Sequence, residues 1–174
     1  SLFLSFTDYS VFQPAKWIGF SNFRRMFFED EKFWVSFWVT FRFAIFQVPI
    51  KLAFSLMVAV ILSRNTKAIG VYRAAFYIPS LMGGSVAVAL TWKQLFSYNG
   101  AINKITSYFG MEPVKWLSNP DTALGVLISL GVWQFGSSML IFLAALKNVP
   151  QSYHEAAIVD GAGPVRRFFS IVLP

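Results

Sequence analysis

Two long stretches of the sequence contain no charged residue, and this feature limits the chain to folds that surround such stretches with lipid or protein. They cover residues 74–92 and 122–146, and a third apolar stretch covers residues 43–62 with Lys51 inside it. A helix of about 20 residues crosses a hydrocarbon core roughly 30 Å thick. Because backbone polar groups in lipid must be hydrogen-bonded internally, we expect each stretch to form a membrane-spanning helix.

The composition supports a membrane protein and excludes several other classes. Of the 174 residues, 56% are hydrophobic and only 13% are charged, against roughly 25% charged in an average soluble domain. The absence of cysteine, the single histidine and the eight acidic residues leave little material for a metal centre or an acid–base pair. The net charge of +7 is spread along the chain beside apolar runs, which indicates a bilayer boundary rather than a nucleic-acid-binding surface. We therefore predict no catalytic residue, no metal site and no bound cofactor.

The polar segments complete the expected organisation of one membrane domain over residues 1–174. Residues 1–6 read as the end of an earlier span, so the sequence is expected to be truncated at both ends. Phe23, Met26 and Phe27 share one face of a predicted helix, which indicates a segment in the membrane interface.

Charge counts do not orient the chain. Residues 63–73 and 147–170 lie on one side of the membrane in this arrangement and hold six Lys or Arg, but the opposite side also holds six. Four tryptophans near that opposite side predict an aromatic belt: Trp34, Trp38, Trp92 and Trp116.

A polar stretch at about residues 150–174 has the pattern of a short helix, a turn and a second short helix. Ser152 and Glu155 match the S-x-x-E capping box of a helix start. Gly161 permits the backbone conformation of a sharp turn, and Pro164 suits the first turn of the second helix.

The spacing within this stretch resembles the EAA loop of ABC importer permeases. Three residues separate Glu155-Ala156-Ala157 from Gly161, and nine residues separate Gly161 from Ile171-Val172-Leu173-Pro174. The form Asp160-Gly161-Ala162-Gly163 is similar to that of the maltose and glycerol-phosphate branch, which takes up sugars. The resemblance covers essentially the whole chain, through Pro79-Ser80-Leu81, Trp92-Lys93-Gln94-Leu95-Phe96, Trp116-Leu117-Ser118-Asn119-Pro120 and Trp133-Gln134.

The resemblance implies an all-α, multi-pass transmembrane helical bundle with a cytoplasmic helix-turn-helix docking loop, in the inner membrane of a bacterium or archaeon. It implies a permease subunit for a sugar or related carbohydrate, not an enzyme. The expected partners are a second permease subunit, a homologue by family precedent, two ATPase subunits that bind the ATP, and an external solute-binding protein. The implied docking residues are Glu155, Ala156, Ala157, Asp160, Gly161, Ala162 and Gly163, with Arg166 and Arg167 as further polar contacts.

Three residues within the spans are candidates for the solute pathway. Trp133 could stack on a sugar ring and Gln134 could hydrogen-bond it, or both could serve helix packing. Lys51 either faces a polar cavity or pairs with another helix, or else its ammonium group extends to a membrane surface or the span is shifted in register.

Two other functions stay open from the sequence. One is an ABC importer permease for another small polar solute, and the other is a secondary carrier. A proton-coupled carrier typically needs ionisable, often acidic, groups at membrane depth, and the three stretches contain no Asp or Glu.

The small residues of the stretches predict close helix packing, and Pro49 predicts a kink in the first helix. These small residues are Gly83, Gly84, Ala87, Gly125 and Ser129.

Overall fold

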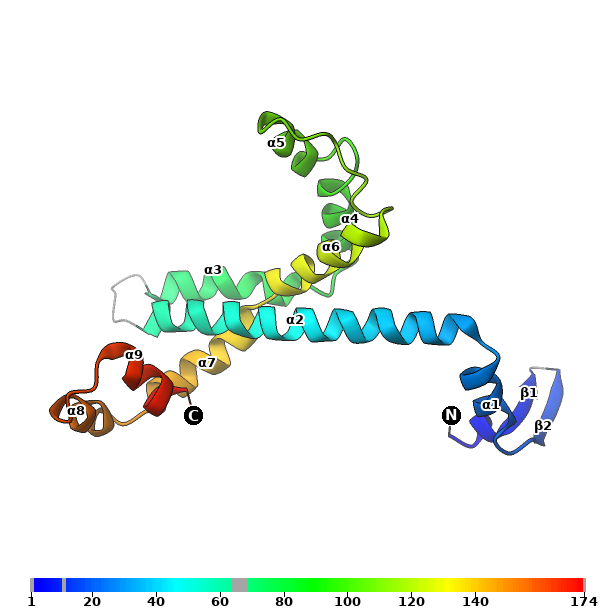
Figure 1. The fold of residues 1–174 in the computed structure, drawn as a ribbon, viewed down its shortest axis with the longest axis horizontal. Helices are drawn as coiled ribbons and strands as arrows, with labels where there is room; N and C mark the ends of the chain where they lie inside the picture. The colour runs from blue at the N-terminus through cyan, green and yellow to red at the C-terminus, as the bar shows by residue number, and fades with distance from the viewer. Residues whose placement is uncertain (1, 11, 64–68, 174) are drawn as a thin grey trace. The chain divides into compact units, whose positions relative to one another are not determined.

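The computed structural model describes residues 2–10, 12–63 and 69–173, which divide into two units, residues 1–45 and 46–174. Helices dominate both units, as the sequence predicts (Figure 1). Part of the basic loop expected at residues 63–73, namely residues 64–68, lies outside the described residues.

The first unit contains a β-hairpin that the sequence analysis did not predict. Its elements are η1 (Leu4–Phe6), β1 (Thr7–Ser10), β2 (Gln13–Trp17) and α1 (Ser21–Phe28), and the strands are antiparallel with Thr7 opposite Trp17. The rings of Phe6 and Trp17 stack with centroids 5.6 Å apart, and the Asn22 side-chain amide donates to the carbonyl oxygens of Ser5 and Thr7, each at 3.0 Å. Aromatic packing and this amide therefore hold the hairpin on α1.

The same packing uses part of the face expected to lie in the membrane interface. The ring of Phe23 lies 5.3 Å from that of Phe6, whereas Phe27 is 42% exposed. Leu4–Phe6 is a single turn of 3-10 helix, so the proposal that residues 1–6 end an earlier span stays a prediction.

The first apolar stretch lies inside a longer helix, α2 (Glu31–Ser63). The helix begins where the Asp30 carboxylate accepts a hydrogen bond from the backbone N–H of Lys32 at 2.9 Å, twelve residues before the expected start at residue 43. It continues through Pro49. Among the described residues, α2 is the one helix that is long and apolar enough to cross a membrane by itself.

The other two apolar stretches are broken, and the prediction of two uninterrupted helices is wrong in this respect. Residues 74–92 fall on α3 (Ile69–Met82) and α4 (Val86–Leu95), which are bent by 97° (Figure 1). Residues 122–146 fall on α6 (Pro120–Trp133) and α7 (Gly136–Asn148), which are bent by 47°. Each pair is long enough to cross a membrane only when its two helices count as one span.

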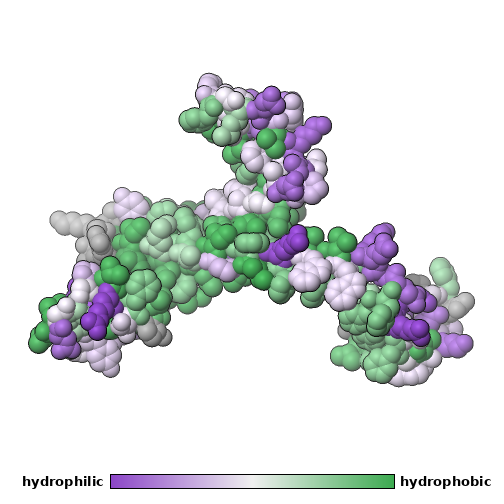
Figure 2. All heavy atoms as spheres, in the orientation of Figure 1, coloured by the Kyte–Doolittle hydropathy of each residue, from purple (hydrophilic) through white to green (hydrophobic). Residues whose placement is uncertain are grey.

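The core of the second unit lies between α2 and α7. It is built from apolar side chains with less than a tenth of their surface exposed: Val58, Ala59, Leu62, Phe135, Met139 and Leu143. Figure 2 shows apolar side chains covering α2, α3 and α7, whereas hydrophilic ones gather over α5 (Ala101–Tyr108). The chain continues after α7 with α8 (Gln151–Val159), α9 (Pro164–Arg167) and the π-helical turn η2 (Phe168–Val172).

Candidate functional site

The two helix breaks of the second unit interlock through side-chain hydrogen bonds. The Ser80 hydroxyl, near the end of α3, donates to the Gln134 carbonyl at 3.0 Å and accepts from the Ser137 N–H at 3.1 Å. The Gln134 amide in turn donates to the Gly83 carbonyl at 3.3 Å. A helix break leaves backbone groups without their usual partners, and these side chains supply replacements. We call residues 80–85 and 134–137 the junction.

Helix α2 contributes a third side to the junction. The Ser55 side chain is fully buried, and its hydroxyl shares one proton between the Lys51 carbonyl at 2.6 Å and the Phe135 carbonyl at 3.2 Å. Two turns earlier, the Gln47 side chain lies directly against Gly131 of α6. The face of α2 that carries Gln47 and Ser55 is therefore directed at the end of α6 and the α6–α7 break.

Glycine at two junction positions is required by close approach. A Cβ atom at Gly136 would overlap the Phe76 carbonyl oxygen and lie 2.8 Å from the Tyr77 Cα. A Cβ atom at Gly83 would overlap the Gln134 side chain. Close packing is thus confirmed for Gly83 but not for Gly84 or Gly125, where a Cβ atom would meet nothing within 4 Å.

The structure places one of the three solute-pathway candidates, Gln134, in the junction. Lys51 lies on α2 one turn before Ser55. The Trp133 ring lies 5.6 Å from the ring of Trp92, whose indole N–H donates to the Val126 carbonyl at 3.3 Å. This contact gives Trp133 a packing role, and solute contact by all three residues stays a prediction.

The predicted docking loop forms the expected two short helices, α8 and α9. Gly161 has φ +75°, its N–H donates to the Ile158 carbonyl at 3.0 Å, and the Ala162 N–H donates to the Ala157 carbonyl at 2.8 Å. This pair of bonds around a left-handed residue is the Schellman motif, which favours glycine. The turn at Gly161 is therefore explained by backbone geometry.

The capping box predicted for this loop is wrong. Helix α8 starts at Gln151 after Pro150, so Ser152 lies inside its first turn and no side chain caps the helix. Glu155 therefore does not take part in a capping box, and its side chain is exposed.

The surface of the docking loop has the features of a protein contact. Glu155, Ala156 and Asp160 are exposed, whereas Ala157 is buried. A groove of about 420 Å³ is lined by Tyr153, Ala156, Ala157, Asp160, Ser170 and Ile171. Apolar side chains are also exposed here, Val159 at 87% and Val165 at 71%.

The two arginines of α9 differ in their surroundings. Arg166 is exposed, as a polar contact to a partner requires. The Arg167 Nε is buried and has no hydrogen-bond partner among the residues that the structure describes.

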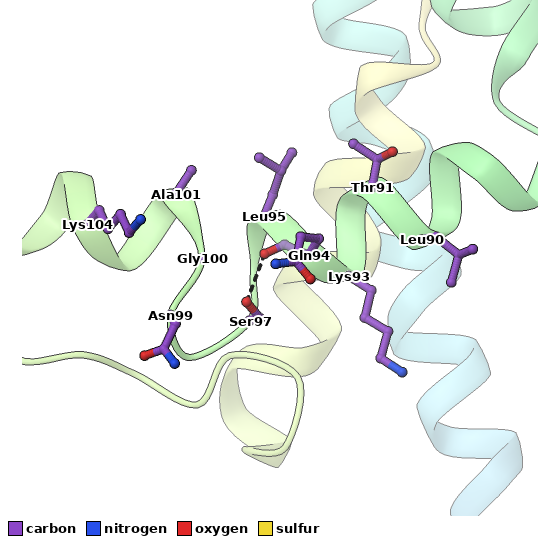
Figure 3. A pocket seen from close by; sticks show the side chains of 10 residues that line it. All are labelled: Leu90, Thr91, Lys93, Gln94, Leu95, Ser97, Asn99, Gly100, Ala101 and Lys104. Atoms are coloured by element: carbon purple, nitrogen blue, oxygen red, sulfur yellow. Dashed lines mark hydrogen bonds between the residues drawn. The ribbon is translucent and has the colours of Figure 1, made fainter.

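A second polar region surrounds α5 and is organised by Asn103, which is 2% exposed. Its amide nitrogen donates to the carbonyls of Tyr98 and Val114, and its oxygen accepts from the Val114 N–H and the Trp116 indole. Beside it lies an open pocket of about 800 Å³ (Figure 3), lined by Leu90, Thr91, Lys93, Gln94, Leu95, Ser97, Asn99, Gly100, Ala101 and Lys104. Lys93 and Lys104 lie on opposite sides of this pocket, so it has no single cationic centre (Figure 3).

The sequence analysis missed several residues that build these sites, namely Gln47, Ser55, Ser80 and Asn103. The signal for the first three is a small or amide polar residue within an apolar stretch, where an unpaired polar group is costly. Asn103 lies in a polar segment and carries no such signal.

Comparison with known proteins gives the following matches. The model of the family described as "Binding-protein-dependent transport system inner membrane component" matches residues 32–174. The probable ABC transporter permease protein YesP of Bacillus subtilis is 54% identical over 100% of this chain and 57% of its own length. The trehalose/maltose transport system permease protein MalF of Thermococcus litoralis is 37% identical over 94% of this chain and 56% of its own.

A solved structure shares the fold. A chain from the crystal structure of a bacterial ABC transporter that imports the acidic polysaccharide alginate superposes with a TM-score of 0.81 at 24% identity, over 99% of this chain and 59% of that chain. The present chain thus spans just over half the length of the relatives it matches.

Proposed function

Because the chain belongs to the family of binding-protein-dependent transport system inner membrane components, we propose that it is the permease subunit of an ATP-binding-cassette importer for a sugar or related carbohydrate. Its partners are a second, homologous permease subunit, two ATPase subunits and an external solute-binding protein. ATP is bound by the ATPase subunits, and this chain is not itself an enzyme.

The docking loop carries this proposal. Its Schellman turn at Gly161 fixes the angle between α8 and α9, and the groove beside Ala156 leaves room for a partner side chain. Glu155 and Asp160 supply exposed carboxylates on the same short helix and its end. Closure of the ATPase subunits on ATP binding would move this loop, and through α7 the α6–α7 break.

A cytoplasmic docking loop also assigns the two sides of the membrane. If the α6–α7 pair crosses the membrane once, α5 and the pocket beside Asn103 lie on the outer side. That side is where an external binding protein would deliver the solute, and Lys51, Trp133 and Gln134 would contact the solute on its way.

The names of the relatives support a small polar solute. One relative is named for trehalose and maltose, one for sulfoquinovosyl glycerol, and several for sn-glycerol 3-phosphate. One relative named for sn-glycerol 3-phosphate is 34% identical to this chain. Its name favours a second candidate function, an importer permease for a small polar solute that is not a sugar.

The test is ATP hydrolysis by the full-length complex, reconstituted with its binding protein and screened against a carbohydrate panel. One or more carbohydrates should stimulate the wild-type complex. Glu155→Ala should reduce that stimulation severalfold while the complex still assembles in detergent, because an exposed carboxylate contributes to the contact but not to the fold. Unchanged stimulation in the variant would refute the docking role. A wild-type complex that no carbohydrate stimulates would refute the substrate class.

A further inference from the structure

We propose that Lys51 binds an anionic group of the transported solute, so that the solute is an acidic carbohydrate rather than a neutral sugar. This inference rests on the proposed importer function and specifies its substrate class. It starts from the position of one cation in the middle of an apolar helix.

With residues 43–62 taken as the membrane-spanning part of α2, Lys51 lies too deep for its charge to reach a membrane surface. It is eight residues from Phe43 and eleven from Leu62, the ends of the first apolar stretch, which is about 12 Å and about 16 Å along a helix. A four-carbon side chain does not bridge either distance. A charge at this depth is costly unless it faces protein or water and has a partner.

The face of α2 that carries Lys51 is directed at protein. Gln47, one turn before, lies against Gly131, and Ser55, one turn after, donates to the Phe135 carbonyl. Residues four apart occupy nearly the same side of a helix. Lys51 is itself half-buried, and this spacing places it alongside residues 131–135, the stretch that contains Trp133 and Gln134.

After Glu31, the one acidic residue on the described helices around Lys51 is Asp121, in the first turn of α6 and ten residues (about 15 Å along a helix) before Gly131. The sequence has no Asp or Glu in residues 32–111 or 122–154, and these ranges include α3, α4, α7 and all of α2 after Glu31. The polar side chains on its face of α2 and in the junction are hydroxyls and amides: Gln47, Ser55, Ser80 and Gln134. None of them neutralises an ammonium group, so the position suits an anion that arrives and leaves.

The neighbouring side chains fit a carbohydrate that bears such an anion. A lysine ammonium binds a carboxylate, phosphate or sulfonate as a point charge. The Gln134 amide, released from the Gly83 carbonyl, can hydrogen-bond a hydroxyl group. A few placed polar groups among apolar and aromatic walls are typical of small-molecule sites.

The experiment compares matched solutes in the full-length complex with its binding protein. The probes are a disaccharide of two hexuronic acids, the neutral disaccharide obtained by reducing its carboxyl groups, and a hexose phosphate. Stimulated ATP hydrolysis is titrated with each probe for the wild type, Lys51→Met and Lys51→Arg. Arg42→Met is the control, because it removes one cation from the same helix outside the apolar stretch.

At least one acidic probe should stimulate the wild type more strongly than the neutral disaccharide, and which one does so distinguishes carboxylate from phosphate. Lys51→Met should raise the half-saturating concentration of that probe about tenfold or more, because one partner of a desolvated charge pair is lost. Lys51→Arg should restore most of the preference, and Arg42→Met should leave it unchanged.

Two results would overturn the inference while leaving the importer function intact. One is a wild-type complex stimulated by the neutral disaccharide and by neither acidic probe. The other is an acidic preference that survives in Lys51→Met. Failure of every probe, acidic or neutral, and of a wider neutral sugar panel would instead refute the proposed function.

Discussion

Gly136→Ala tests whether the interlocked helix breaks hold the second unit together. The added Cβ would overlap the Phe76 carbonyl oxygen and lie 2.8 Å from the Tyr77 Cα and 2.9 Å from the Ser80 Oγ. Two of these atoms belong to the backbone of α3 and cannot rotate away, so α7 must shift. We expect overpacking to cost about 1–3 kcal/mol.

Two smaller effects act on the same substitution in opposite directions. A shift of α7 weakens the hydrogen bond from the Ser137 N–H to Ser80, which contributes about 1 kcal/mol. Replacing glycine by alanine in a helix gains at most about 1 kcal/mol. These two effects cancel, and the expected net destabilisation is about 1–3 kcal/mol.

The assay is the thermal unfolding midpoint of the full-length protein in detergent, with Gly125→Ala as the matched control. Gly125 also lies within a helix, but its Cβ would meet nothing within 4 Å, so this variant should be as stable as the wild type or slightly more stable. Equal midpoints for Gly136→Ala and Gly125→Ala would refute the close approach at the junction.

Two further predictions concern the polar segments. Asn103→Leu should make residues 96–118 sensitive to protease, because the carbonyls of Tyr98 and Val114, the Val114 N–H and the Trp116 indole lose their hydrogen-bond partner. The exposed Asn99 is the control, and Asn99→Leu should not raise protease sensitivity. Limited proteolysis with mass spectrometry distinguishes the two variants. Gly161→Val should strain the docking loop by at least about 1–2 kcal/mol, since its φ is +75°, and should lower stimulated ATP hydrolysis. Gly163→Ala, at φ −67°, should retain normal stimulation, and equal loss in both variants would contradict the turn geometry.

The docking loop was the part of the fold most accessible from sequence. Gly161 and Pro164 act on their own backbone, so the turn and the start of α9 could be predicted from local rules. The start of α8 could not be predicted in this way. The sequence pattern makes Ser152 the N-cap residue, whereas in the structure the N-cap residue is Pro150.

The helix breaks could not be predicted from hydropathy, because residues 74–92 and 122–146 are apolar throughout and their hydropathy does not mark a break. Their position depends on partners far apart in sequence, such as Ser80 with Gln134, which are 54 residues apart. The hairpin was missed for a similar reason, since Phe6 and Trp17 become neighbours only after the turn forms.

Cysteine labelling of the docking loop tests the central claim most directly. Residues 1–174 contain no cysteine, so Val159→Cys, at an 87% exposed position of α8, reports on one site once any cysteine elsewhere in the full-length protein is replaced. Tyr108→Cys, at a 90% exposed position of α5, is the control.

The account predicts that a membrane-impermeant maleimide labels Tyr108→Cys from outside intact cells but does not label Val159→Cys. In inverted membranes, Val159→Cys should be labelled in the absence of the ATPase subunits and protected when they bind. Labelling of Val159→Cys from outside, or equal labelling with and without the ATPase subunits, would contradict the assignment of this loop as the docking site.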